Sequence, residues 1–209
     1  MRRPPLTPRL FGQRGIKRAE KLGIDPARLP PGQSPTLKFP LFTSMGEPDV
    51  DTAEWSLSVH GNVHEPFALR WDELLALPQT SLTTDLHCVT RWSKFDTAWR
   101  GVRVRDLLDR AQPFAGAEHA LASCFDGYTT NLPLEVLRHD DVLIAWEHDG
   151  RPLPREHGGP ARLLVPERYL WKSAKWIRGL EVTRERKLGF WERNGYHPEG
   201  DPWQEQRHW

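Results

Sequence analysis

The sequence has few cysteines, almost no net charge and no long apolar run. Its two cysteines, Cys88 and Cys124, are too few for a disulfide framework, so a reducing compartment and a cytoplasmic location are expected. The 29 basic and 28 acidic residues leave a net charge of +1, which argues against a nucleic-acid-binding protein. No apolar run approaches the roughly 20 residues of a membrane span, and no apolar stretch follows Arg2-Arg3 to complete an export signal.

Metal-binding patterns are equally sparse. The nine histidines are scattered, and there is no CxxC pair. His60 and His64 flank a Gly-Asn turn, which is unlike the helix face on which two histidines pair around zinc. A zinc site built by the protein alone is therefore not expected. A single cysteine would suffice as a metal ligand only if another molecule supplied the remaining ligands.

Tryptophan and proline, by contrast, are abundant, with 10 and 19 residues. Tryptophan supplies large buried area and can also wall a flat aromatic ligand. Proline indicates irregular, loop-rich structure in place of long helices.

Three segments are expected along the chain. Residues 1–38 are rich in arginine, proline and glycine and predict an extended N-terminal arm, either a mobile tail or a strap over the domain. Residues 39–188 are expected to form the folded domain. In residues 189–209, glycine and proline separate large aromatic side chains, so we expect an ordered, non-helical strap packed back on the domain.

The local patterns within the domain are mostly those of short strands. Period-two alternation predicts a half-buried strand over 55–60. Acidic residues in the first turn and a closing proline predict a short helix over 71–77, and one apolar face predicts another over 102–111. Further strands are expected at 121–124, 141–146, 161–166 and 176–183, with a hairpin turn at Asp149-Gly150. Few helices among many strands in mixed order indicate an α+β fold.

Cys88 lies in a segment, 85–94, that is rich in hydrogen-bond donors and positive charge. Such surroundings favour a thiolate, which can act as a nucleophile or as a soft metal ligand. The alternative is a small buried apolar residue, for which Cys124 is the better candidate. The groups expected around the thiol are His87, Thr90, Arg91, Ser93 and Lys94.

Three further segments combine polar groups with glycine or aromatic residues. In 155–163, Gly158-Gly159 allows another group to approach the backbone closely. In 169–176, two lysines and a serine alternate with aromatic residues and could hold a phosphate beside a ring. Segment 126–133 predicts a turn with hydroxyls at its mouth. Each of the three is also compatible with a solvent-exposed loop or a strand edge.

Taken in order, the four segments resemble the sulfite oxidase-type molybdopterin-binding domain, in particular its small bacterial, haem-free, single-domain members. Residues 87–93 are similar to the family's molybdenum-cysteine segment, 127–134 to its middle loop and 157–176 to its cofactor-phosphate segment. The resemblance covers residues 39–183. It implies an α+β fold of mixed β-sheets with short helices.

The resemblance implies a molybdenum-molybdopterin cofactor and no haem. The pterin brings two dithiolene sulfurs to the metal, so the protein contributes one thiolate, which is Cys88. The residues that the resemblance assigns to cofactor binding are His87, Cys88, Tyr128, Thr129, Thr130, His157, Arg162, Ser173, Ala174 and Lys175.

The activity implied is transfer of an oxygen atom to or from a small oxo-compound, such as sulfite or a sulfoxide, with an external electron partner. We expect the C-terminal strap to wall the substrate entrance, where Tyr196 or His197 would donate a hydrogen bond or a proton beside Cys88. The strap could equally serve packing alone.

Two alternatives to this enzyme stay open at the level of sequence. One is a non-catalytic molybdopterin-binding or carrier module, which a funnel plugged by Trp191 or Tyr196 would favour. The other is a cysteine-based protein without a metal.

Overall fold

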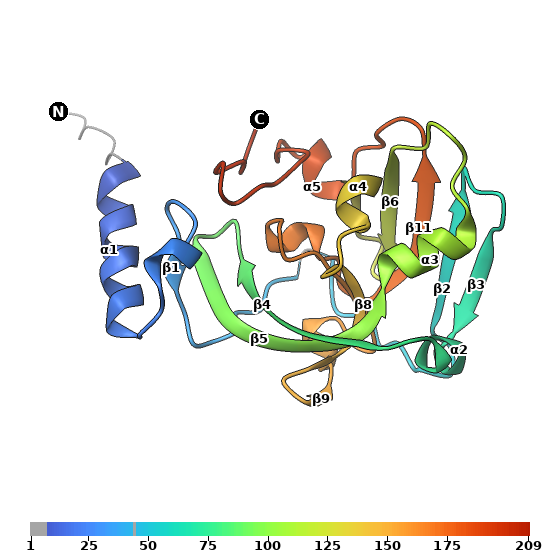
Figure 1. The fold of residues 1–209 in the computed structure, drawn as a ribbon, viewed down its shortest axis with the longest axis horizontal. Coiled ribbons are helices and arrows are strands. Elements are labelled where there is room, and N and C mark those ends of the chain that lie inside the picture. Colours follow the sequence, from blue (N-terminus) through green and yellow to red (C-terminus); the bar gives the residue numbers. More distant parts are fainter. Residues whose placement is uncertain (1–7, 44) are drawn as a thin grey trace.

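The structure, a computed structural model, describes residues 8–43 and 45–209. An N-terminal helix, α1 (Pro8–Lys21), stands beside a body built from two β-sheets, and the C-terminal segment lies on that body (Figure 1). Within the described residues, none of the helices has the length and apolar character needed to cross a membrane.

The first sheet has six strands and carries one wall of the later site. Its central path runs β1-β5-β8-β10, while β4 pairs with β5 and β9 pairs with β8. Only the β1–β5 pair is parallel. The strands are β1 (Ser34–Pro35), β4 (Thr80–His87), β5 (Trp92–Arg103), β8 (Leu143–His148), β9 (Arg151–Pro152) and β10 (Arg162–Leu164).

The second sheet has five strands in the order β3-β2-β11-β6-β7. The central pair, β2 with β11, is parallel, and the remaining pairs are antiparallel. The strands are β2 (Ser56–Gly61), β3 (Phe67–Arg70), β6 (His119–Cys124), β7 (Thr129–Pro133) and β11 (Ile177–Thr183).

The helices within the body are short, and each begins where the chain leaves a strand or turn. In α3, residues 104, 107, 108 and 111 are buried, which is the spacing of one apolar face. In α2, the Glu73 carboxylate accepts a hydrogen bond from the Arg70 backbone and so closes the first turn. These helices are α2 (Trp71–Ala76), α3 (Val104–Ala111), α4 (Leu134–Leu137) and α5 (Phe190–Arg193).

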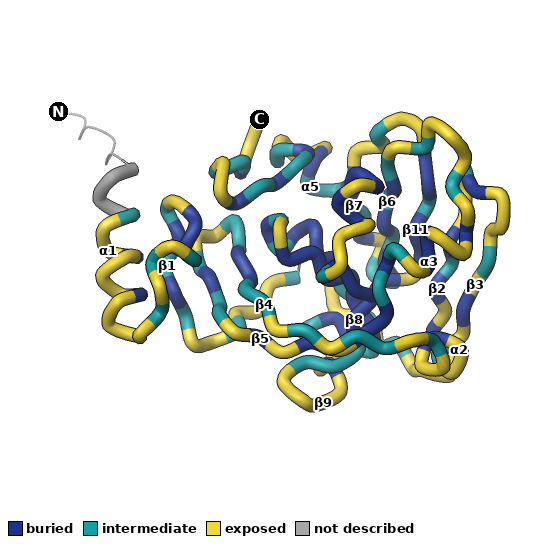
Figure 2. The backbone as a smooth tube through the Cα atoms, viewed as in Figure 1, coloured by how far each residue is buried: buried dark blue, intermediate teal, exposed yellow. Residues whose placement is uncertain are grey.

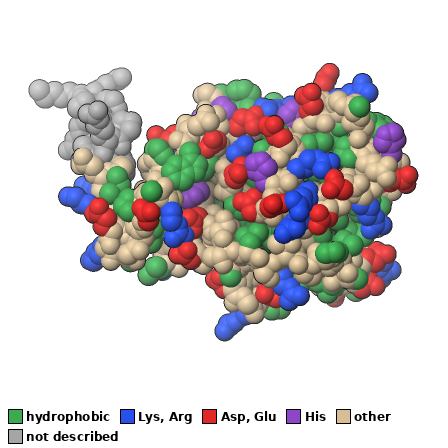
Figure 3. Space-filling model, viewed as in Figure 1, with side chains coloured by type: hydrophobic (Ala, Val, Ile, Leu, Met, Phe, Trp, Pro, Cys, Tyr) green, Lys and Arg blue, Asp and Glu red, His purple; other side chains and the backbone are tan. Residues whose placement is uncertain are grey.

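The main core lies between the five-stranded sheet, α3 and the inner ends of β8 and β10. Figure 2 shows β11 as mostly buried, whereas β6 and β8 contain both buried and intermediate residues. A smaller apolar cluster packs under the six-stranded sheet around Trp99 and Leu143. Basic and acidic side chains are interspersed on the face shown in Figure 3, in keeping with the net charge of +1.

Several expectations are corrected by the structure. The N-terminal residues are not extended throughout, because α1 forms a 14-residue helix with Pro8 at its start, where a proline costs no hydrogen bond. The C-terminal strap is not free of helix, since α5 forms one turn. The helix expected over 102–111 begins at Val104, because β5 runs on to Arg103.

Candidate functional site

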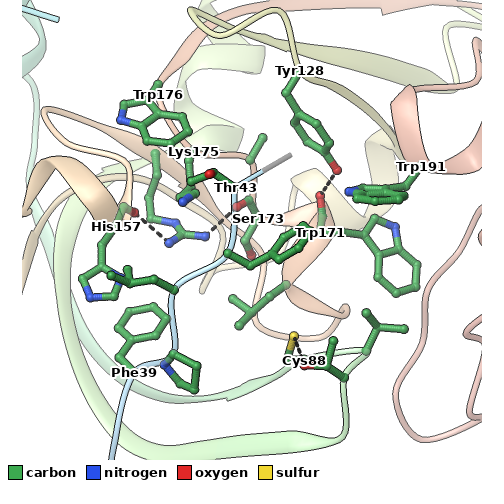
Figure 4. A pocket seen from close by; sticks show the side chains of 18 of the residues that line it. Phe39, Thr43, Cys88, Tyr128, His157, Trp171, Ser173, Lys175, Trp176 and Trp191 are labelled. Carbon is green, nitrogen blue, oxygen red and sulfur yellow. Dashed lines mark hydrogen bonds between the residues drawn. The ribbon is translucent and has the colours of Figure 1, made fainter. Parts of the chain in front are cut away.

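A cavity of about 450 Å³ lies where turns of the two sheets meet. The six-stranded sheet contributes the Cys88–Trp92 turn and Arg162 of β10. The five-stranded sheet contributes Tyr128, between β6 and β7, and Trp176, just before β11. Figure 4 shows these side chains converging on one space, with the Cys88 sulfur on one wall and Lys175 on another. The volume falls within the range of about 300–1,000 Å³ that small-molecule sites occupy.

The Cys88–Trp92 turn joins β4 to β5 and presents the Cys88 sulfur to the cavity. The Cys88 amide donates to the Trp92 carbonyl at 2.9 Å, and the Arg91 amide donates to the Cys88 carbonyl at 3.0 Å. Arg91 takes a left-handed φ of 73°, which allows the chain to reverse here. Thr90 donates from Oγ1 to Cys88 Sγ at 3.2 Å. The sulfur is thereby held by its own turn.

The groups that were expected to activate the thiol mostly point elsewhere. His87 is buried and shares a hydrogen bond of 2.8 Å with Ser93 Oγ. Arg91 faces Glu205, and Lys94 faces Asp149. Burial raises the pKa of the Cys88 thiol, although the Thr90 hydrogen bond and the charge of Arg207 oppose this. The flanking sequence therefore does not make a free thiolate, whereas a bound metal would deprotonate the sulfur directly.

Two cations, Arg162 and Lys175, lie together on the opposite wall. Arg162 is 3% exposed and donates to the His157 carbonyl at 2.9 Å and to the Ser173 carbonyl at 2.6 Å. Burial lowers the pKa of Arg162 to about 10. Lys175 Nζ donates to the Glu156 carbonyl at 2.9 Å, and burial together with Arg162 lowers the pKa of Lys175 to about 8. Neither cation forms an ion pair with a carboxylate of the described residues, although Asp126 of the lining, Glu47 and Glu156 act on Lys175 from a greater distance, so this wall can accept an anion.

The glycines before this wall let Lys175 approach. Gly158 has a φ of 106°, and a Cβ there would lie 2.8 Å from Lys175 Cβ. A side chain at this position would push Lys175 out of the cavity wall. Beside it, His157 stacks on Phe39 with ring centroids 4.0 Å apart, and burial lowers the pKa of His157 to about 4.

An aromatic wall closes the side of the cavity next to the C-terminal segment. Tyr196 packs on Trp171 and Trp191 with ring centroids 5.1 and 4.8 Å apart. Tyr128 Oη donates to the Trp171 carbonyl at 2.6 Å, which ties this wall to the β6–β7 turn (Figure 4). Trp171 Nε1 is buried without a hydrogen-bond partner among the described residues and so offers a donor near the cavity.

The structure brings most of the predicted site residues to this cavity, but not all of them. Thr130 donates to Glu192 at 2.9 Å, and the Thr129 hydroxyl is buried away from the cavity lining. His197 accepts from the Glu199 amide and also lies outside the lining. His87 faces a separate surface hollow. The predicted residues that do line the cavity are Cys88, Tyr128, His157, Arg162, Ser173, Ala174, Lys175 and Tyr196.

Sequence reasoning missed the segment Phe39–Thr43, which runs across the cavity. Its only signal was an irregular apolar run between the N-terminal arm and the first strand. Trp92, Asp126 and Leu170 were missed as well, because each becomes part of the lining only through the fold.

The family model described as the oxidoreductase molybdopterin binding domain matches residues 44–191. The chain belongs to this family. It is an oxidoreductase of the sulfite oxidase-like molybdopterin family, as the resemblance predicted. The uncharacterized oxidoreductase YuiH of Bacillus subtilis is 44% identical over 181 residues, which cover 86% of this chain and 91% of that protein.

Two further relatives are longer than the chain. The putative protein-methionine-sulfoxide reductase subunit YedZ1 of Azospira oryzae is 32% identical over an alignment that covers 78% of this chain and 63% of that protein. The protein-methionine-sulfoxide reductase catalytic subunit MsrP of Campylobacter jejuni is 27% identical over an alignment that covers 68% of this chain and 53% of that protein. The chain therefore spans less than two thirds of either relative.

The fold also matches a solved structure. The sulfane dehydrogenase SoxCD from Paracoccus pantotrophus superposes with a TM-score of 0.62 at 24% identity, over 68% of this chain and 41% of that one. This likeness confirms the predicted fold of mixed β-sheets with short helices.

Family membership implies a molybdenum-molybdopterin cofactor, and the cavity fits one. The wall with Arg162 and Lys175 holds two cations that form no ion pair with a carboxylate of the described residues, as a cofactor phosphate requires. Cys88 offers one soft sulfur on another wall. Among the described residues, no group of three or more His, Cys, Asp or Glu could hold a metal ion. A metal bound by Cys88 would thus take its other ligands from the cofactor.

Proposed function

We propose that the protein moves an oxygen atom to or from a small oxo-compound at a molybdenum-molybdopterin centre and exchanges electrons with an external partner. The observation that carries the proposal is the presence of one thiol, Cys88, and one cation pair, Arg162 with Lys175, on the walls of one cavity. One soft sulfur and one anion-binding group are what a dithiolene cofactor with a phosphate requires from its protein.

The residues of the chain would divide the work of binding and orientation. When bound, the cofactor supplies a two-electron metal centre. Cys88 ligates the metal, and Thr90 orients the sulfur through its hydrogen bond. Arg162 and Lys175 bind the phosphate end. The predominantly aromatic walls exclude water, which strengthens these charge interactions.

The lining favours a neutral sulfoxide over an oxyanion such as sulfite. Arg162 and Lys175 are the only cationic side chains among the described lining residues, and the cofactor would engage both. The substrate side is aromatic, with Trp171, Trp191 and Tyr196, and Tyr196 is the proposed hydrogen-bond donor to the substrate oxygen. The name of the Campylobacter relative, a protein-methionine-sulfoxide reductase, supports the same substrate class. The two free thiols support the proposed cytoplasmic location.

The test is turnover by protein produced in a host that makes molybdopterin. We expect bound molybdenum and pterin, reduction of methionine sulfoxide by reduced viologen, and a slower reaction with sulfite and ferricyanide. Full molybdenum occupancy with no turnover of either substrate would favour a carrier module. Absence of molybdenum and pterin would refute the proposal.

Substitution of the two cysteines separates a metal ligand from a core residue. Cys88→Ala should abolish turnover and reduce molybdenum retention, because the metal loses its protein ligand. Cys124→Ala is the matched control, since Cys124 is buried in the main core and its loss costs at most a few kcal/mol of stability. Metal analysis and turnover are measured on both variants, and equal activity in Cys88→Ala and the wild type would contradict the assignment.

A further inference from the structure

The Cys88–Trp92 turn is held from two sides by segments outside the residues that match the family. Gln33 precedes the matched region and Arg207 follows it. Each places one side chain on one carbonyl of the turn. In Figure 1, β1 and the C-terminal segment both lie near the end of the β4–β5 hairpin that carries this turn.

Gln33 fixes the carbonyl of Cys88. Its side chain is 1% exposed, and Nε2 donates to the Cys88 carbonyl at 3.0 Å. The Arg91 amide donates to the same oxygen, so both of its acceptor sites are used. Gln33 is itself fixed by α1, because a Cβ on Gly15 would lie 2.1 Å from the Gln33 carbonyl oxygen. Helix α1 therefore packs directly on the residue that holds the turn.

Arg207 fixes the next carbonyl, that of Val89. Its side chain is 9% exposed. Nη1 donates to the Val89 carbonyl, and the guanidinium lies 4.9 Å from the Tyr169 ring centre. Nε and Nη2 have no hydrogen-bond partner among the described residues, and the Glu205 carboxylate lies 3.7 Å from Nη2. A buried cation that is so incompletely paired lowers the stability of the folded state.

The two terminal segments also contact each other beside the turn. Gly32 has a φ of 71°, and a Cβ there would lie 2.6 Å from Glu205 Oε1 and 2.8 Å from Arg91 Nη1. The chain before Gln33 and the chain before Arg207 therefore meet without room for a side chain. Together they enclose the turn.

We propose that Gln33 and Arg207 are positioning residues that fix the Cys88 and Val89 carbonyls and so orient the Cys88 sulfur toward the metal. In addition, the charge of Arg207, held at the carbonyl of the residue that follows Cys88, would reduce electron donation by this sulfur and raise the reduction potential of a bound metal. Hydrogen bonds and charge around a ligating sulfur are known to tune metal potentials in this way. The inference rests on the proposed function, since it concerns the metal that Cys88 would bind.

The experiment compares five variants of the molybdenum-loaded protein, three at the proposed positions and two controls. Gln33→Leu removes a neutral donor, so the paramagnetic resonance spectrum of the half-reduced metal should change while its midpoint potential stays near that of the wild type. Arg207→Met removes a charge, so the midpoint potential should fall, and Arg207→Lys should restore most of it. Gln204→Leu and Arg193→Met are matched controls, because both residues are exposed on the same C-terminal segment. Neither control should alter the spectrum or the potential.

Hydrogen exchange of the peptide 86–94 gives a second readout that needs no metal. Exchange should rise severalfold in Gln33→Leu and Arg207→Met and stay unchanged in the controls, because only the first two variants release the turn. Unchanged exchange would overturn the positioning role, even if the variants fail to retain metal. Raised exchange with an unchanged spectrum and potential would show that the contacts serve stability alone and would overturn the inference as well.

Failure of the proposed function would look different. Wild-type protein without molybdenum and pterin would refute that function and the claim about the potential, whereas the exchange measurement would still decide whether Gln33 and Arg207 hold the turn.

Discussion

Single side chains decide whether the cavity can hold an anion. Charge-assisted hydrogen bonds are worth roughly 1.5–3 kcal/mol each, and about 1.4 kcal/mol is a tenfold change in affinity. Replacement of both Arg162 and Lys175 by methionine should therefore lower pterin affinity about 100-fold or more. Pterin content after purification and dialysis measures this. The exposed pair Arg178 and Lys187, changed in the same way, is the control, and equal pterin content in both double variants would contradict the phosphate assignment.

His157 should make stability depend on pH in the acidic range. Burial lowers the pKa of folded His157 to about 4, whereas an unfolded histidine titrates near 6.5. Between these pH values the unfolded chain binds more protons, so the free energy of unfolding falls as the pH decreases from about 6.5 to about 4. His157→Gln should flatten part of this dependence, as judged from urea midpoints at pH 7 and pH 5.

In His157→Gln the free energy of unfolding should still depend on pH, because a second histidine contributes. Burial also lowers the pKa of His87 to about 4, which acts in the same direction. The exposed His60, changed to glutamine, is the control. An identical slope in His157→Gln and the wild type would show that His157 is not the source.

At the scale of elements, α5 is fixed to the body by a fully buried ion pair. Glu192 of α5 contacts Lys172 Nζ and accepts from Thr130 Oγ1 and the Asn131 amide. Burial lowers the pKa of Lys172 even though Glu192 opposes this. Removal of one partner of such a pair typically costs about 3–5 kcal/mol, whereas replacement of both can be nearly neutral.

This pair predicts a distinct mutational pattern. Glu192→Gln should lower the free energy of unfolding by about 3–5 kcal/mol, because it leaves Lys172 charged and buried. The double variant Glu192→Leu with Lys172→Met should recover much of that loss. Urea unfolding measures both. If the double variant is less stable than Glu192→Gln, the attraction between the two charges contributes more to stability than burial of an unpaired Lys172 costs, which would contradict this prediction.

Elements with a clear period were predicted well, and irregular ones were not. The expected strand over 55–60 and helix over 71–77 match β2 and α2 to within a residue, because each shows one apolar face. Strands β4 and β5 were missed, because their segment was interpreted through Cys88 and its polar neighbours. For Lys172 the sequence left open a phosphate ligand or a solvated residue on a strand edge. The structure instead buries it in a 3₁₀ turn with Glu192, a contact 20 residues away.

At the scale of the whole molecule, the cavity lies between two sheets that share the main core. Ligand bound in it would contact both sheets and would stabilise the folded state by mass action. Molybdenum-loaded protein should therefore melt higher than protein from a host without molybdopterin, by roughly 2–4 °C for each kcal/mol of binding energy realised. Differential scanning calorimetry measures this. The Arg162 and Lys175 double variant should lose most of the difference, and an equal melting temperature for loaded and unloaded protein would argue against binding between the sheets.

The sequence alone could not predict which of the candidate side chains face the cavity, because this depends on how the two sheets pack. The four segments around Cys88, Tyr128, Arg162 and Lys175 were picked out by their residue patterns and given roles by the resemblance, and the fold brings these residues to one cavity. Which hydroxyl or imidazole faces that cavity depends on packing across both sheets. Thr130 and His197 carry suitable groups, but their partners are Glu192 and the Glu199 amide.

The contacts on the Cys88–Trp92 turn also set an order of assembly. Gln33 and Cys88 are 55 positions apart, whereas Val89 and Arg207 are 118 apart. During synthesis the residues of the first contact are present before β6, β7 and β11 of the second sheet are made, whereas the second contact must wait for the C-terminal segment. Contacts over such separations are also the slowest to form in folding. Until the C-terminal segment is in place, the turn is therefore held only from the Gln33 side and the cavity lacks the Trp191 and Tyr196 part of its wall.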